Sequence, residues 1–164
     1  MLDALIVAPG NPAEIYQGLS ETYSAIENPI WAGLLANALR TQGKDVEIID
    51  VPAQSDRFLI ETIEDTKPTL VVMCVYGQQP SASTQNMHSA GKLCQRIKIN
   101  HPEQKILIVG GHPSALPDRT LNEEACDYVA KGEGLNTILG LLAGGPLSSV
   151  PGLHYRELDQ VYRG

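Results

Sequence analysis

Short apolar runs alternate with amphipathic segments along most of this chain. The apolar runs are typical of buried strands and cover Asp3–Pro9, Val46–Asp50, Leu70–Val75, Lys105–Val109 and Tyr128–Ala130. The segments between them place apolar residues at helical spacing, and they predict helices over Pro29–Gln42, Asp56–Thr66, Ser83–Asn100, Pro117–Glu124 and Leu135–Leu142. Strands and helices therefore follow one another in turn.

The first two predicted helices also have a predicted buried face. In the first helix, Asn28 would be the N-cap, Pro29 the first helical residue and Gly43 the stop. The residues expected to face the core are Leu34, Leu35, Ala38 and Leu39 in this helix, and Phe58, Leu59 and Ile63 in the next.

Parallel strands need a helical crossover between neighbours, so this order of elements predicts an α/β fold. We expect a Rossmann-like, doubly wound sheet of about five parallel strands with helices on both faces. Its strand order would be flavodoxin-like rather than the six-stranded order of dinucleotide-binding folds. The sequence after Pro151 no longer fits a strand–helix unit and predicts a hairpin or the first strand of something further on. Residues 1–145 would form one domain, and 146–164 a linker or first strand.

Composition narrows the classes of function. With 12 basic and 19 acidic residues, the formal net charge is −7, which disfavours a nucleic-acid-binding surface. No window approaches the ~18 apolar residues of a membrane span, and the N-terminus lacks the basic region of an export signal, so we expect a cytoplasmic protein. Cys74, Cys94 and Cys126 lack metal-binding spacing and are interpreted as buried, reduced thiols.

Four loops would meet at the carboxyl edge of the sheet, where open α/β sheets bind ligands. They are Gly10–Asn28, Tyr76–Ser83, Gly110–Leu116 and Lys131–Gly134. The first is much longer than the roughly two to six residues usual in such loops, as in a functional lid, a docking surface or a mobile insertion. Glycines at the ends of the strands would let the backbone approach a bound ligand closely.

Several polar residues in these loops have two interpretations. Ser81 or Ser83 caps the following helix, or binds a phosphate or an amide-bearing ligand together with the amides of that helix. His112 is a hydrogen-bonded structural residue or a metal ligand. Glu133 complements the dipole of the last helix or contacts a ligand.

The chain has no evident catalytic motif. It lacks the GxSxG, Walker and HExxH patterns, and Gly110-Gly111 is not the GxGxxG of dinucleotide-binding folds. Two functions remain open on the residues alone. One is a flavodoxin-like FMN-binding or partner-interaction domain, although the chain has few aromatic residues to enclose a flavin. The other is a small hydrolase using His112 and Glu133, which lacks a placed nucleophile.

Three segments resemble the N-terminal cobalamin-binding domain of B12-dependent radical SAM enzymes. They are IENPIWAGLLANALRTQGKDVEIID, KPTLVVMCVYGQQPSASTQNM and ILIVGGHPSALPDRTLNEEACDYVAKGEG. The pairing of GGHPSALP with the later GEG is more specific than either half alone. The resemblance covers roughly Leu2 to Leu142, and PGLHYRE is similar to the strand that leads such proteins into their catalytic barrel.

The resemblance implies a Rossmann-like domain that holds cobalamin across its carboxyl edge. The loop after the third strand and the GGHP segment would line the nucleotide tail, the GEG turn would contact the tail or the corrin edge, and the first loop would face the lower side of the ring. The implied contact residues are Asn11, Pro12, Tyr76, Gly77, Ser81, Ser83, Gly110, Gly111, His112, Pro113, Gly132, Glu133 and Gly134.

The chain departs from the wider cobalamin family at three points. The DxHxxG motif that supplies a histidine to cobalt is missing, which matches the radical SAM branch, where the cobalamin base is commonly displaced and no histidine lies beneath cobalt. Cys74 stands where the wider family often has a serine. The CxxxCxxC motif that binds the radical SAM cluster is also missing, so this chain alone would not cleave S-adenosylmethionine.

We therefore expect a cobalamin-binding module without catalysis of its own. The resemblance implies a parent radical SAM enzyme, a methyltransferase or cyclase, that carries a [4Fe-4S] cluster and S-adenosylmethionine in a catalytic domain of the same polypeptide. Residues 146–164 would lead into that domain.

Overall fold

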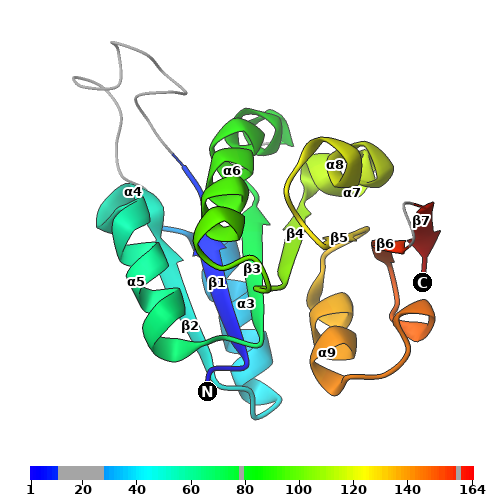
Figure 1. The fold of residues 1–164 in the computed structure, drawn as a ribbon, viewed down its shortest axis with the longest axis horizontal. Coiled ribbons are helices and arrows are strands. Elements are labelled where there is room, and N and C mark those ends of the chain that lie inside the picture. The colour runs from blue at the N-terminus through cyan, green and yellow to red at the C-terminus, as the bar shows by residue number, and fades with distance from the viewer. Residues whose placement is uncertain (11–27, 78–79, 158–159) are drawn as a thin grey trace.

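The described part of the chain folds around one sheet of seven strands (Figure 1). The computed structural model describes residues 1–10, 28–77, 80–157 and 160–164. The strands are β1 (Ala4–Ala8), β2 (Val46–Asp50), β3 (Leu70–Val75), β4 (Ile106–Gly110), β5 (Tyr128–Ala130), β6 (Leu153–Glu157) and β7 (Gln160–Arg163). The helices are α3 (Ile30–Thr41), α4 (Val51–Gln54), α5 (Asp56–Thr66), α6 (Pro80–Asn100), α7 (Gly111–Ala115), α8 (Pro117–Glu123) and α9 (Leu135–Ala143), with a 3-10 turn η2 at Leu147–Ser149.

The strand order is β2-β1-β3-β4-β5-β6-β7. Strands β1 to β5 are parallel, in the flavodoxin-like order that the sequence predicted, so the expected fold class is confirmed. Strands β6 and β7 form the hairpin expected after Pro151, and β6 also pairs antiparallel with β5, so the hairpin lengthens the sheet.

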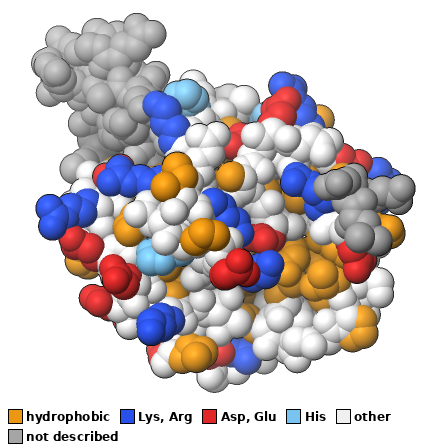
Figure 2. Space-filling model, in the orientation of Figure 1, with side chains coloured by type: hydrophobic (Ala, Val, Ile, Leu, Met, Phe, Trp, Pro, Cys, Tyr) orange, Lys and Arg blue, Asp and Glu red, His pale blue; other side chains and the backbone are white. Residues whose placement is uncertain are grey.

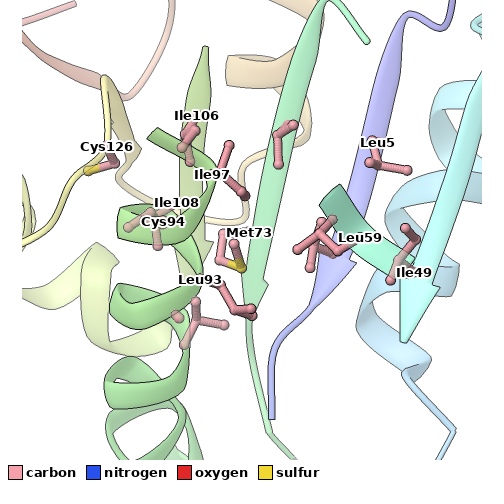
Figure 3. Close-up of a cluster of buried hydrophobic side chains, with 14 of the residues drawn as sticks. Leu5, Ile49, Leu59, Met73, Leu93, Cys94, Ile97, Ile106, Ile108 and Cys126 are labelled. Atoms are coloured by element: carbon pink, nitrogen blue, oxygen red, sulfur yellow. The ribbon is translucent and has the colours of Figure 1, made fainter. Parts of the chain in front are cut away.

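Each face of the sheet packs against its own layer of helices. Alternate residues of a strand point to opposite faces, so Leu5 and Val7 join a core with α5, α6 and α8, whereas Ala4 and Ile6 join a core with α3 and α9. Figure 3 shows the first core, with Met73 of β3 facing α6. Strand β3 is buried at every residue, as is usual for a central parallel strand.

Helix α3 buries a face that matches the predicted one only in part, with Leu35 and Leu39 buried as expected and Ala38 half-buried. Its buried residues are Ala32, Leu35, Ala36 and Leu39. Leu34, which was predicted to face the core, is 56% exposed. The prediction was wrong because almost every position from Ile30 to Leu39 is apolar or small, so spacing alone does not single out one face. In α5, Leu59 and Ile63 are buried as expected, but Phe58 is exposed.

Several element boundaries also differ from the predictions. Pro29 rather than Asn28 is the N-cap of α3. Helix α6 begins at Pro80 rather than Ser83, which is possible because the first residue of a helix needs no backbone N–H donor. The loop predicted after β4 is largely helix α7, which begins at Gly111 directly after the strand.

The C-terminal hairpin is fastened to the domain by side chains on both faces of the sheet. On one face, the Asp118 carboxylate of α8 lies 2.8 Å from His154 Nδ1 of β6 and accepts a 2.7 Å hydrogen bond from Arg163 of β7. On the other face, Tyr155 is buried in the core with α3 and α9, and within the hairpin it stacks on Tyr162 with ring centroids 5.6 Å apart. The hairpin is therefore held against the rest of the sheet by side chains as well as by strand pairing.

Surface side chains are mixed in kind over α5 and α6, and a larger apolar area lies near α9 and the last strands (Figure 2). Among the described residues, no helix is long and apolar enough to cross a membrane.

Candidate functional site

The carboxyl ends of β3 and β4 approach each other very closely. A Cβ atom on Gly110 would lie 2.1 Å from the carbonyl oxygen of Val75, and the φ of Gly110 is +155°. No other residue type fits this point of the chain without moving the backbone of β3. The glycine at the end of β4 is therefore required for the packing of the two strands.

Ser83 joins the loops that follow β3 and β4. Its hydroxyl donates a 2.5 Å hydrogen bond to the Val75 carbonyl oxygen and accepts a 2.9 Å hydrogen bond from the His112 backbone N–H. The residue is only 2% exposed. Because Ser83 lies inside α6, the capping interpretation is wrong for this residue, and its hydroxyl is engaged within the protein. Ser81, in the first turn of the same helix, is exposed.

His112 is fixed above the sheet by α6. Its Nδ1 lies 3.0 Å from the Thr84 hydroxyl, and its side chain is half-buried. Pro113, the next residue, is buried in α7. Thr84 thus sets the orientation of the imidazole ring. This is the hydrogen-bonded position that one of the two sequence interpretations expected.

The turn after β5 contributes exposed backbone to the same edge. Gly132 has a φ of +99°, its missing side chain would meet nothing within 4 Å, and its N–H donates a 2.8 Å hydrogen bond to the Ser114 hydroxyl. Gly134 is different, because a Cβ there would lie 2.8 Å from Cγ1 of Val109. Glu133, between them, is exposed. Gly132 is therefore open to a ligand, whereas Gly134 is needed where α9 packs on β4.

Tyr76 connects three elements across the edge. Its ring stacks on the ring of Trp31 of α3, with a centroid distance of 4.8 Å and an interplanar angle of 24°. Its hydroxyl donates a long hydrogen bond of 3.4 Å to the Gly132 carbonyl oxygen. Asn86 of α6 donates to the backbone oxygen of Tyr76. Burial, followed by the nearby Cys74 and Glu133, raises the pKa of the Tyr76 phenol, so the hydroxyl remains a hydrogen-bond donor.

Gly77 follows Tyr76 and packs tightly, since a Cβ there would lie 2.2 Å from Cβ of Ala82. Cys74, two residues before Tyr76, lies under this part of the edge and is 4% exposed. Burial raises the pKa of its thiol to about 12, so it is neutral at ordinary pH. All three cysteines are buried and free, as predicted.

The structure brings most of the predicted residues together at one edge. Tyr76, Gly77, Ser83, Gly110, Gly111, His112, Pro113, Gly132, Glu133 and Gly134 all lie in or beside the loops that follow β3, β4 and β5. Asn11 and Pro12 lie outside the described residues.

Sequence reasoning missed three contributors, namely Trp31, Thr84 and Ser114. Each contacts a predicted residue from another part of the chain, as in the pair Thr84 and His112, which are 28 positions apart. No local signal in the sequence reveals such pairs. The aromatic residue at the start of a helix next to the long first loop was the nearest available clue for Trp31.

A depression lies at the opposite, amino edge of the sheet. This open pocket of about 490 Å³ is lined by Ile63, Glu64, Lys67, Pro68, Asn100, His101, Pro102, Glu103 and Gln104. It contains none of the predicted contact residues. Ligands of open parallel sheets bind at the carboxyl ends of the strands, so the carboxyl edge is the stronger candidate.

The donor set at the carboxyl edge suits a large organic ligand better than a bare metal ion. Among the residues that the structure describes, no three His, Cys, Asp or Glu side chains are grouped so that they could hold a metal. The edge instead offers the bare backbone of Gly111 and Gly132, the His112 ring and the aromatic pair. Such a surface can contact a broad planar molecule through backbone, rings and hydroxyls.

Comparisons with known proteins agree with this geometry. A family model described as "B12 binding domain" matches residues 16–142. Among solved structures, the radical S-adenosylmethionine methyltransferase TsrM from Kitasatospora setae, with tryptophan and a SAM analogue bound, superposes with a TM-score of 0.76 at 19% identity over 98% of this chain and 29% of its own. The structure of the cobalamin-dependent S-adenosylmethionine radical enzyme OxsB with aqua-cobalamin bound superposes with a TM-score of 0.71 at 20% identity. The match covers 99% of this chain and 22% of the OxsB chain. No curated protein matches the chain.

Proposed function

Because this chain belongs to the family of B12 binding domains, we propose that it holds cobalamin along the carboxyl edge of its sheet, as one module of a longer radical SAM enzyme. The resemblance noted in the sequence is confirmed by the family match over residues 16–142. The same match favours cobalamin over the FMN alternative. One observation supports the position of the site most strongly. Gly111 and Gly132 present bare backbone at the edge, and neither is needed for internal packing.

The residues of the edge divide into two roles under this proposal. Gly111, His112, Gly132 and Tyr76 touch the cofactor or its nucleotide tail. Ser83, Gly110 and Gly134 hold the loops at the right spacing, because their hydroxyl or missing side chain is used within the protein. Gly77 and Pro113 belong to the same framework, and Ser81 and Glu133 are peripheral contacts.

The chemistry of the parent enzyme lies outside this chain. The chain spans 29% of the TsrM structure and 22% of the OxsB structure. A [4Fe-4S] cluster and S-adenosylmethionine would be held by the rest of such a protein, in the same polypeptide. Bound cobalamin supplies a cobalt centre that accepts and donates methyl groups or electrons. This module contributes binding, orientation and exclusion of water, toward methyl transfer or cyclisation.

Two further parts of the proposal concern the chain as a whole. Residues 1–145 are the cobalamin-binding unit, and 146–164 lead toward the catalytic domain while their hairpin extends the sheet. A reducing, cytoplasmic location is supported by the three free, buried thiols, since secreted domains of this size commonly pair their cysteines.

The proposal is tested by mixing the purified chain with hydroxocobalamin, removing free ligand on a desalting column and recording the visible spectrum. We expect about one retained corrinoid per chain with a base-off spectrum, because no DxHxxG histidine is available beneath cobalt. Retention with a base-on spectrum would keep the ligand but contradict the proposed mode of binding. A well-folded chain that leaves the column colourless would contradict the function.

A further inference from the structure

Trp31 is the one tryptophan of the chain, and it stands at the first turn of α3 beside the carboxyl edge. One side of its indole is stacked against Tyr76, yet the residue remains 43% exposed. Its neighbours Ile30 and Leu34 on α3 are 61% and 56% exposed. A large ring held at a ligand-binding edge, with much of its area still open to solvent, has surface left for a second contact.

Tyr76 gives this ring a fixed support. The Tyr76 backbone oxygen accepts a hydrogen bond from Asn86, and the side-chain hydroxyl donates to Gly132. The ring also packs against the core between the sheet, α3 and α9. Because Tyr76 is fastened at both ends, the indole that stacks on it has few orientations to lose when a ligand arrives. A preorganised ring binds more tightly than a mobile one.

Flat aromatic ligands are recognised by such rings. Stacking of a nucleotide base on an aromatic side chain contributes about 1–3 kcal/mol, judged by alanine substitution, and every planar base has a face to offer. An aliphatic surface of the same size does not distinguish a flat ring from other apolar groups. The ligand at this edge carries one flat heteroaromatic base, at the end of its nucleotide tail.

We propose that Trp31, supported by Tyr76, is the stacking surface for the planar base of the cobalamin nucleotide tail, and that it makes the site selective for corrinoids that carry such a base. This inference rests on the proposed function, because it requires cobalamin at the carboxyl edge. It goes further by assigning the discrimination between corrinoids to one residue of α3.

The test compares dissociation constants for hydroxocobalamin and for diaquocobinamide, a corrinoid without the nucleotide tail, measured by absorption titration. Trp31→Ala should weaken hydroxocobalamin binding roughly 5- to 150-fold, the change expected for one lost base stack. It should leave cobinamide binding within about twofold. Trp31→Phe should restore most of the lost affinity, because it keeps an aromatic face.

Two variants separate stacking from other effects. Leu34→Ala removes a neighbouring exposed apolar side chain of α3 and should leave both constants within about twofold. Tyr76→Ala removes the support and should reduce hydroxocobalamin binding at least as much as Trp31→Ala does. Circular dichroism checks that each variant is folded.

The possible outcomes can be told apart. Selective loss of hydroxocobalamin affinity in Trp31→Ala supports the inference. Equal losses for both corrinoids, or no loss, would overturn it while leaving cobalamin binding by the wild-type chain intact. A wild-type chain that binds neither corrinoid would overturn the proposed function, and this inference with it.

Discussion

The two edges of the sheet are built from different chemistry. At the amino edge, Asp127 accepts hydrogen bonds from Lys98, Lys105 and the Ile106 backbone N–H, at 2.8, 3.2 and 2.9 Å. At the carboxyl edge, short hydroxyl side chains tie backbone to backbone, as Ser83 and Ser114 do. Charged side chains join the chain segments at the first edge. Hydroxyls at the second join the loops to one another and leave glycine backbone open to a ligand.

This difference shows why the carboxyl edge is able to bind a broad cofactor. Long charged side chains would fill the space above the strands, whereas serine and glycine fix the loops without occupying it. The carboxyl edge therefore combines residues that stabilise the loops with backbone left open for binding, whereas these residues of the amino edge contribute to stability alone. The following substitutions test this difference between the edges, beginning with the largest expected effect.

The largest effect should come from replacing Gly110. In Gly110→Ala the new methyl group would meet the Val75 carbonyl oxygen 2.1 Å away, at a φ of +155°. Strain and overpacking together should lower the free energy of unfolding by roughly 3–5 kcal/mol. Urea denaturation followed by circular dichroism measures this loss.

Gly111→Ala is the matched control, because its new methyl group would meet only Ser83, at 3.6 Å. This variant should keep its stability within about 1 kcal/mol and lose roughly tenfold in cobalamin affinity. If the two glycine variants behaved alike in both measurements, the distinction between packing and binding glycines would be wrong.

The next effect concerns the buried hydroxyl that joins the two loops. Ser83→Ala leaves the Val75 carbonyl and the His112 N–H without their partner. Each unpaired buried group costs about 1–3 kcal/mol, so the free energy of unfolding should fall by roughly 2–4 kcal/mol. Ser81→Ala, two residues away and exposed, should change it by less than about 0.5 kcal/mol. Equal losses in the two serine variants would contradict the assigned role of Ser83.

A substitution at the amino edge should change stability without changing binding. Asp127→Asn removes the negative charge that pairs with Lys98 and Lys105. All three residues lie at the edge of the sheet remote from the proposed site. Because Asp127 and Lys98 are mostly buried, we expect a loss of about 1–3 kcal/mol. Cobalamin affinity should stay within about twofold. A loss of affinity as large as that of Gly111→Ala would mean that the two edges are not independent.

The fold was more predictable than the site for a definite reason. Runs such as Leu70–Val75 are apolar without interruption, and uninterrupted apolar runs separated by helices specify a parallel sheet. Gly110 and Gly132 look alike in the sequence, yet one packs against β3 and the other faces open space. That difference depends on contacts between distant segments, which local pattern does not contain.

Helix α3 illustrates the same limit. Its apolar residues surround the whole helix, so the sequence allowed several buried faces, and Leu34 was placed in the core wrongly. Leu34, the misassigned residue, is exposed near Trp31 on the same helix. The stacking of Trp31 on Tyr76 joins residues 45 positions apart and could not be read from spacing.

The smallest predicted effect is the pH dependence of the hairpin contact. Hydrogen bonds from Arg163 and then His154 lower the pKa of the Asp118 carboxyl below its ordinary value of 3.8. A lowered pKa in the folded state stabilises the protein above pH 3.8, and this stabilisation is lost as the pH falls through the folded-state pKa. Asp118 is partly exposed, so Asp118→Asn should cost less than about 1 kcal/mol at neutral pH.

Urea denaturation at about pH 7 and about pH 3 measures this contribution to the free energy of unfolding. The difference in free energy of unfolding between wild type and Asp118→Asn should shrink at the lower pH. The control Asp65→Asn, at an exposed position of α5, should match wild type at both pH values. A difference that grows on acidification would mean that the Asp118 carboxylate does not stabilise the hairpin.

The central claim, that cobalamin lies on the carboxyl edge, is tested most directly by amide resonances of the isotope-labelled chain during titration with hydroxocobalamin. We predict that the largest saturable shifts fall on Gly111, His112 and Gly132 and on the indole N–H of Trp31, while Gln104 and Lys105 at the amino edge stay in place. Saturable shifts centred on the amino-edge pocket, with the carboxyl edge unchanged, would contradict the account.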